Sequence, residues 1–213
     1  MTAPDGGSLR EQVQRLLDGP LPLPIVQAGD PVLRGVAAPY AGELDGALLP
    51  RLVEAMRTTM HAAPGVGLAA TQVGLPVAIA VVEDQWEADP DSARVRERTP
   101  VPFRVLVNPA YEPVGTERVS FYEGCLSVHG WQAVVARWRT VRLTALDEHG
   151  RPVDEVLTGW PARIVQHETD HLAGRLYVDV AEMRSLVSPT EALRWSADLT
   201  PDRAAAALGF PLA

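Results

Sequence analysis

The sequence predicts an α+β fold in which short antiparallel strands wrap around a central metal-binding helix. The first observation is a helical stretch at residues 159–171 that carries two histidines four positions apart between apolar flanks. The second is a series of short segments rich in Val, Leu and aromatic residues, which is typical of strands. The third is a pair of helical patterns near the two chain ends, outside the strand-rich part.

Length and composition predict one main domain. The chain has 213 residues, 46% of them hydrophobic and 22% charged, and a formal net charge of −8. This acidic balance argues against broad nucleic-acid binding. No apolar run approaches the roughly 18 residues of a membrane span, and the start of the chain lacks the basic and apolar parts of a secretory signal. A single cysteine, Cys125, fits a reducing compartment. We therefore expect a cytoplasmic protein.

Two helices and one short turn are predicted before the first strand. Ser8 and Glu11 form a capping-box pattern for a short helix that ends before Gly-Pro at residues 19–20. Asp30 and Pro31 predict the N-cap and first residue of a single helical turn. Residues 45–63 predict the first long helix. Its apolar stripe consists of Leu49, Leu52, Val53, Met56 and Met60.

The segment at residues 65–72 (GVGLAATQ) superficially matches a dinucleotide-binding glycine loop. Such a loop follows a strand and opens a helix. Here the segment follows a helix and leads to a strand predicted at residues 77–82, so nucleotide binding is not expected. Residues 83–100 are charged and without periodicity, which predicts an exposed loop.

The remaining elements follow from strand composition and from helix capping signals. Strands are predicted at residues 104–107, 118–122, 133–136, 140–146 and 153–157. The central helix is predicted to start near Gly159, with Pro161 in its first turn, and to end at a C-cap on Gly174. A capping box at residues 188–191 predicts a helix to residue 197, and a last short helix is predicted from residue 201 to Gly209.

Residues 166–172 (QHETDHL) place two histidines on one face of the central helix, the spacing at which two imidazoles bind one metal ion. Glu168 lies beside them as a proton carrier. Three residues compete as the third ligand: Glu191, as in a zinc endopeptidase, Cys125, and His129. If His129 binds together with Cys125, the site is closed and structural, whereas Cys125 with the two histidines leaves one position open, as in catalytic sites. The pattern alone leaves these alternatives open.

Three motifs in a fixed order make the chain resemble the peptide deformylases, metalloenzymes that remove the formyl group from the N-terminal formylmethionine of new proteins. The motifs are residues 65–72 (GVGLAATQ), 123–127 (EGCLS) and 166–172 (QHETDHL), and residues 29–34 (GDPVLR) resemble the start of the family. The resemblance covers roughly residues 23–182. It implies a metal-dependent hydrolase of protein biosynthesis with the fold described above. It also implies a ferrous ion (Fe2+) that Ni2+, Co2+ or Zn2+ readily replaces.

The same resemblance implies the roles of the residues around the ion. The metal ligands carried over by position are Cys125, His167 and His171. Glu168 is the implied catalytic acid/base. Asp170 and Glu123 are candidates to support the ligands, with Glu123 in a pair with Arg137.

The resemblance also implies how the substrate is held. The side-chain amide of Gln72 and the backbone N–H of Leu126 would face the formyl oxygen, and Val66 and Gly67 would pair with the peptide backbone as an added strand. Glycines fit that task because they let one backbone approach another closely. The methionine side chain needs an unbranched apolar pocket. The candidates for its wall are Leu126, Phe121, Val66 and Trp160, although residues of these types are more often plain core residues.

Two residues depart from the family pattern near the expected mouth of the site. His129 stands where proline is frequent and Gln132 where arginine is common. These departures affect the expected preference for the peptide part of the substrate and leave the chemistry unchanged. A non-catalytic relative that only binds formyl peptides has no evident need for Glu168, so the enzyme is the favoured interpretation.

The expected partners are N-formylmethionyl peptides of nascent chains, and a transient ribosome contact is left open as a second partner. The sequence contains no Lys/Arg-rich run that would form a docking patch, and neither nucleic-acid nor membrane binding is expected. Three parts are predicted: an N-terminal extension with a short helix at residues 1–22, a catalytic domain at 23–187 and a C-terminal helical extension at 188–213.

Overall fold

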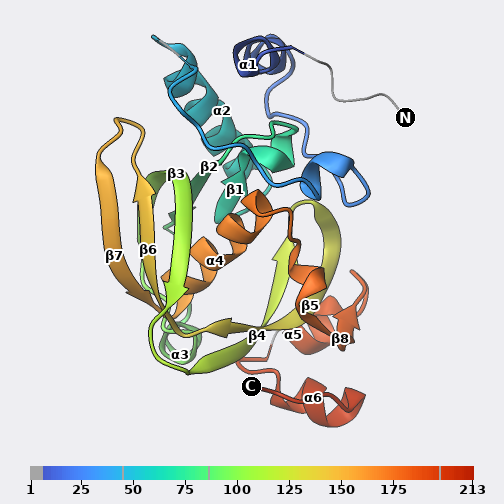
Figure 1. Ribbon diagram of the computed structural model, residues 1–213. Coiled ribbons are helices and arrows are strands. Elements are labelled where there is room, and N and C mark those ends of the chain that lie inside the picture. Colours follow the sequence, from blue (N-terminus) through green and yellow to red (C-terminus); the bar gives the residue numbers. More distant parts are fainter. Residues whose placement is uncertain (1–6, 45, 86, 197) are drawn as a thin grey trace.

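The computed structural model describes residues 7–44, 46–85, 87–196 and 198–213. Its helices and antiparallel sheets confirm the predicted α+β class (Figure 1). The predicted first residue of the long helix, residue 45, and the predicted end of the C-terminal helix, residue 197, lie outside the described residues.

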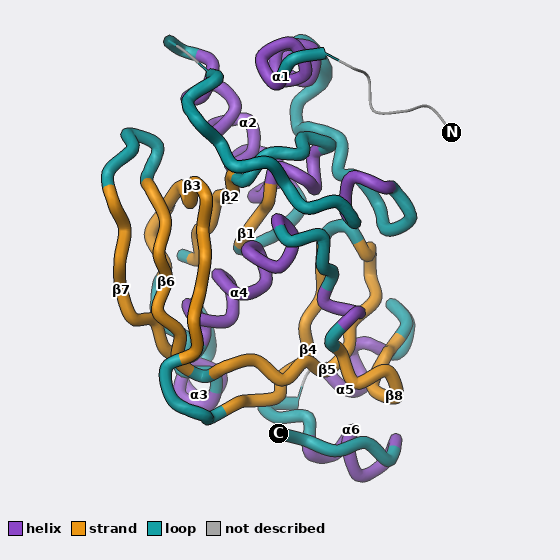
Figure 2. Tube along the Cα trace, viewed as in Figure 1, coloured by secondary structure: helices purple, strands orange, loops and turns teal. Residues whose placement is uncertain are grey.

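The strands form two antiparallel sheets on either side of helix α4 (Trp160–Leu172), as Figures 1 and 2 show. The five-stranded sheet has the order β1-β2-β3-β6-β7, with β1 (Gly67–Ala69), β2 (Ile79–Asp84), β3 (Val101–Pro113), β6 (Thr140–Leu146) and β7 (Pro152–Thr158). The three-stranded sheet has the order β4-β5-β8, with β4 (Arg118–Cys125), β5 (Val128–Trp138) and β8 (Ala181–Val187). Strands β1 and β4 each lie at an edge of their sheet.

The other helices lie outside the space between the two sheets (Figure 1). They are α1 (Leu9–Leu17), α2 (Leu48–Ala62), α3 (Pro90–Val95), α5 (Ala192–Ser196) and α6 (Asp202–Leu208). Short 3-10 turns are formed by Pro31–Leu33, Ala70–Val73 and Tyr177–Asp179. Helix α2 buries its predicted apolar stripe, and Leu52, Met56 and Met60 of that stripe are completely buried. Across the described part of the chain, no helix has both the length and the apolar character that a membrane crossing requires.

Helix α4 is held between the sheets by its apolar face and by glycines at both ends. Ala162, Ile164 and Val165 pack into the cluster that contains Leu106 and Leu143 of the five-stranded sheet. Gly159 precedes the helix and has a φ of 68°. It lies so close to the backbone of Glu97 that a Cβ at residue 159 would be 2.8 Å from the Glu97 carbonyl oxygen. Gly174 follows the helix with a φ of 72°. These constraints fix where the polar face of α4 points.

The terminal segments pack on opposite sides of this body. Val13 of α1 is completely buried in the cluster formed by α2 and strands β1 and β2. At the other end, Trp195 and Phe210 pack against Tyr122 and Val134 of the three-stranded sheet. The segments therefore extend two separate parts of the core.

The structure differs from the sequence-based expectation in several boundaries. Helix α2 begins at Leu48, and β3 continues to Pro113, well past the predicted end at residue 107. The predicted exposed loop at 83–100 contains helix α3, which buries no side chain, and its first two residues belong to β2. Strand β8 was not predicted, and helix α5 begins after the predicted capping box. The glycine segment at 65–72 forms the short edge strand β1 and a 3-10 turn, so it is not a nucleotide loop.

Candidate metal centre

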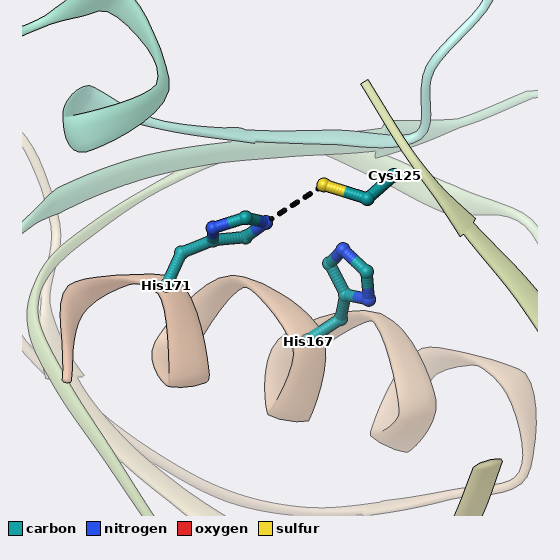
Figure 3. Close-up of side chains that lie close together, drawn as sticks. All are labelled: Cys125, His167 and His171. Carbon is teal, nitrogen blue, oxygen red and sulfur yellow. Dashed lines mark hydrogen bonds between the residues drawn. The ribbon is translucent and has the colours of Figure 1, made fainter. Parts of the chain in front are cut away.

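The two sheets and helix α4 bring the three predicted ligands together. Cys125 ends strand β4, and His167 and His171 lie on successive turns of α4 with their rings directed toward the cysteine (Figure 3). Their ligand atoms all lie within 4.8 Å of one another, and the Cys125 Sγ–His171 Nε2 distance is 3.2 Å. Within the described residues, this is the one group of three or more His, Cys, Asp or Glu side chains with such spacing.

The chemistry of this group fits a transition-metal ion. Burial holds the pKa of His171 well below its usual value, so its imidazole is neutral, as a ligand must be. Burial opposes protonation of His167 too, but contacts with Cys125 and Glu123 raise its pKa well above the usual value. One thiolate and two imidazoles leave a fourth position for water or substrate, which is the arrangement of a catalytic site.

Glu123 is the centre of a buried ion-pair network beneath the ligands. Its carboxylate accepts two hydrogen bonds from Arg137, both at 3.0 Å, and one from Arg163 at 2.6 Å, while its Oε2 lies 3.1 Å from His167 Nδ1. Arg137 also pairs with Asp170. The predicted pair of Glu123 and Arg137 is thus present, and it orients His167 through the ring nitrogen that faces away from the sulfur.

The buried carboxylates and guanidinium groups of this network balance in charge, and the half-exposed Arg175 also lies 3.5 Å from Asp170. Two carboxylates face two guanidinium groups, and all four side chains are buried. Burial alone would raise the pKa of Glu123, but Arg137, His167 and Arg163 together hold it well below its usual range. Glu123 is therefore ionised at neutral pH.

Glu168 lies in the same cavity in a different environment. Its side chain is 4% exposed, and its Oε2 atom has no hydrogen-bond partner among the described residues. Burial raises the pKa of Glu168 to about 7. A carboxyl group with this pKa exchanges a proton readily at neutral pH. Gly67 of strand β1 lies against it, so close that a Cβ there would be 2.3 Å from Glu168 Oε1.

Gln72 is oriented by its own neighbours toward the cysteine. Its Oε1 accepts a hydrogen bond from the Ala69 N–H at 2.8 Å, and its Nε2 lies 3.3 Å from Ser127 Oγ and 3.6 Å from Cys125 Sγ. The amide N–H groups therefore face the metal-ligand side. Leu126 follows Cys125 directly and lines the same cavity.

A cavity of about 570 Å³ opens beside the ligands. Among the predicted substrate-binding residues, Val66, Gly67, Leu126 and Trp160 line it together with Gln72 and Glu168. Phe121 is not among the described residues that line this cavity. Its ring lies 5.1 Å from the Arg96 guanidinium carbon and 5.2 Å from that of Arg163. Phe121 thus packs behind the wall that Arg163 forms.

The two rival ligands do not join the group. His129 lines the cavity but is outside the metal-ligand group, and its backbone N–H donates to Gln27 Oε1 at 3.4 Å. Glu191 lies outside that group and its carboxylate is 3.5 Å from Arg194 Nη1. Gln132 lines the cavity near its mouth, opposite Gly124.

Sequence reasoning missed two groups that shape the site. Tyr177, which is 1% exposed, stacks its ring on His167 with a centroid distance of 6.3 Å and an interplanar angle of 19°. Asp84, also 1% exposed, accepts two hydrogen bonds from Arg98 at 2.9 Å and one from Trp160 Nε1 at 2.6 Å. Asp84 and Trp160 are far apart in the chain. Tyr177 follows His167 closely, but it lies beyond the end of α4 at Leu172, so no helical spacing marks that contact in the sequence.

Comparison with known proteins gives a consistent result. Residues 22–186 match the family described as polypeptide deformylase. The chain is similar to peptide deformylase 3 of Streptomyces avermitilis, with 64% identity over 99% of this chain and 96% of that protein. It is also similar to peptide deformylase 1 of Streptomyces coelicolor, with 62% identity over 99% of this chain and 97% of that protein.

Among solved structures, the chain is similar to the Met-Ala-Ser-bound class I type b peptide deformylase from Acinetobacter baumannii. The TM-score is 0.66 and the identity 36%, over 74% of this chain and 97% of the other. A peptide deformylase from Synechococcus elongatus in complex with actinonin gives a TM-score of 0.65 and 32% identity, over 91% of this chain and 89% of that one.

Proposed function

The chain belongs to the polypeptide deformylase family, and on that premise we propose that Cys125, His167 and His171 bind the catalytic metal ion and that Glu168 carries the proton. As a member of this family the protein is a metal-dependent hydrolase that removes the formyl group from the N-terminal methionine of nascent proteins. The observation that carries the residue assignment is the meeting of the three ligand atoms beside the cavity that Glu168 lines.

Glu168 acts as base and then as acid in the proposed mechanism. The ion, when bound, supplies Lewis acidity and lowers the pKa of water. Glu168 accepts a proton from the attacking water, and its pKa of about 7 suits that transfer near neutral pH. As the C–N bond of the formyl group breaks, Glu168 delivers this proton to the departing methionine nitrogen. The buried, unpartnered Oε2 is available for both transfers.

Gln72 and Leu126 stabilise the charge that develops on the formyl oxygen. The Gln72 amide is held by the Ala69 N–H, so its own N–H groups face the reaction site. The backbone N–H of Leu126 is the second proposed donor, directly after the ligand Cys125. Removing one donor of this type typically costs roughly 3 kcal/mol of transition-state stabilisation.

The peptide part of the substrate adds to the free edge of strand β1. That strand is at the edge of its sheet, and Val66 and Gly67 line the cavity. Backbone pairing of this kind gives affinity without reading the sequence of the peptide. The methionine side chain occupies the apolar part of the cavity beside Val66, Leu126 and Trp160. The similar protein from Acinetobacter baumannii has been solved with Met-Ala-Ser bound, which supports the binding of a short peptide.

Ferrous iron is the proposed native ion, with nickel, cobalt and zinc as replacements. Thiolate and imidazole donors suit all four of these metals. We further propose a cytoplasmic enzyme that meets nascent chains at the ribosome. The single cysteine supports this, because as a metal ligand it has to stay reduced. We also propose that residues 1–22 and 188–213 are extensions of a catalytic domain formed by residues 23–187.

The test is Glu168→Ala, assayed on formyl-Met-Ala with the metal content measured. We expect the metal to be retained and turnover to be lost, and near-normal turnover would refute the proposed role. Cys125→Ala should lose the metal, whereas Glu191→Ala should keep both metal and turnover. The reverse pattern for these two variants would favour a zinc endopeptidase instead.

A further inference from the structure

Trp131 is an exposed aromatic side chain at the mouth of the catalytic cavity. It is 42% exposed, and it lines the cavity that contains Cys125 and His167. Its neighbour Gln132 lies opposite Gly124, the residue before the metal ligand, in the β4–β5 ladder. Large apolar side chains next to a binding cavity are candidates for ligand contact, whereas isolated ones elsewhere on a surface need no explanation.

The backbone at Trp131 is fixed from several directions although its indole is exposed. The Tyr177 hydroxyl donates to the Trp131 carbonyl oxygen at 2.9 Å, and the Tyr177 ring stacks on His167. Gly130 has a φ of 80° and packs so tightly that a Cβ there would lie 2.6 Å from Pro189 Cγ. The backbone that carries the indole is therefore tied both to Tyr177, which stacks on His167, and to the first residues of the C-terminal segment.

We propose that Trp131 is a specificity-determining residue that contacts the side chain following the formylmethionine and favours aromatic or large aliphatic residues there. This rests on the proposed function, because the formyl carbon has to lie at the metal centre. An extended peptide advances about 3.3 Å per residue. The second residue of the substrate therefore follows the formylmethionine by one such step, beside the cavity that Trp131 lines together with Cys125 and His167.

A rigid support makes this contact effective. An indole on a fixed backbone offers a large apolar face and has only two side-chain torsions to order, so contact with it costs little conformational entropy. Because Pro189 packs on Gly130, the C-terminal segment acts here as a positioning element for the rim. This gives that segment a role in substrate selection besides its packing on the three-stranded sheet.

The experiment compares formyl-Met-Phe-Ser with formyl-Met-Gly-Ser for the metal-loaded enzyme. Trp131→Ala is expected to reduce the ratio of the two kcat/KM values about fivefold to tenfold, mainly through KM for the phenylalanine peptide. Trp131→Phe should restore part of the ratio, and Pro189→Ala should reduce it less than Trp131→Ala. Leu193→Ala is the matched control, because Leu193 is 82% exposed in the same C-terminal segment and does not line the cavity.

Each outcome decides the proposal. An unchanged ratio in Trp131→Ala, or an equal loss on both peptides, overturns it while the deformylase activity stands. An unchanged ratio in Pro189→Ala alone overturns the role of the C-terminal segment. A wild-type enzyme that deformylates neither peptide overturns the proposed function and this inference together.

Discussion

Gly67 lies directly against the Glu168 carboxyl, so Gly67→Ala tests how the proton carrier is positioned. The new Cβ would lie 2.3 Å from Oε1, 2.5 Å from Cδ and 2.7 Å from Cγ of Glu168. Ordinary contact for a Cβ atom begins at 3.4 Å, so Oε1 has to retreat by about 1.1 Å, the difference between the two distances.

The carboxyl has to move because the strand is held. Gly67 lies opposite Val82 in the β1–β2 ladder, and the Val66 carbonyl accepts the Glu83 N–H at 3.0 Å. A misplacement of about 1 Å in a catalytic site can cost roughly 100-fold in rate. That factor corresponds to about 2.7 kcal/mol of activation free energy. We therefore expect kcat of Gly67→Ala to fall about 100-fold.

The assay measures kcat and KM on formyl-Met-Ala together with metal content and thermal unfolding. Gly124→Ala is the matched control, because its new Cβ would be 3.5 Å from the nearest atom, Gln132 Cγ. The control should stay within about twofold of wild type. A Gly67→Ala enzyme with wild-type kcat and a raised KM would refute the reasoning, since it would assign Gly67 to peptide binding alone.

Three further predictions concern the surroundings of the site. The folded-state pKa of Glu123 lies well below the unfolded value of about 4.3. Its ionised form therefore stabilises the fold above that pH, and this contribution is lost as the pH falls toward the folded-state pKa. We expect Glu123→Gln to lose about 3 kcal/mol of unfolding free energy at pH 7, measured by urea titration of chelator-treated protein. The difference in unfolding free energy from wild type should narrow below about pH 4. A difference that does not change with pH would contradict this reasoning. Asp84→Asn weakens the bonds that hold Trp160 and should raise KM for formyl-Met peptides about tenfold at nearly constant kcat, whereas a fall in kcat alone would argue against a binding role. His129→Ala should leave the metal content per chain unchanged in elemental analysis, and a loss of metal would instead indicate a closed structural site.

Local signals explain why the central helix and the placement of its two histidines on one face were predictable from the sequence. Gly159, Pro161 and Gly174 mark the ends of α4 because their backbone preferences act within a few residues. The four-residue spacing of His167 and His171 likewise places both side chains on the same face of a helix. The proximity of Cys125 to these histidines was expected only from the order of three motifs, since no local rule connects Cys125 to α4.

The missed features depend on contacts between distant parts of the chain. Strand β8 pairs with β5, and its side chains do not alternate regularly between buried and exposed. Helix α3 buries no side chain, so it lacks the apolar stripe by which helices are recognised. Phe121 was expected in the pocket from its type, but the position of Arg163 that covers it follows from the fold.

The proposed substrate binding requires strand β1 to keep an unpaired edge, and such an edge carries a risk of aggregation. An unpaired edge invites other chains to pair with it and so to aggregate. In this protein the edge strand is only three residues long, Gly67–Ala69, and it lines a recess rather than an open face. A folded protein cannot present a strand there, whereas the loose end of a growing polypeptide can. The recessed edge that limits self-association therefore also limits when the substrate can bind. The enzyme has to act while the N-terminus of the growing chain is still unfolded.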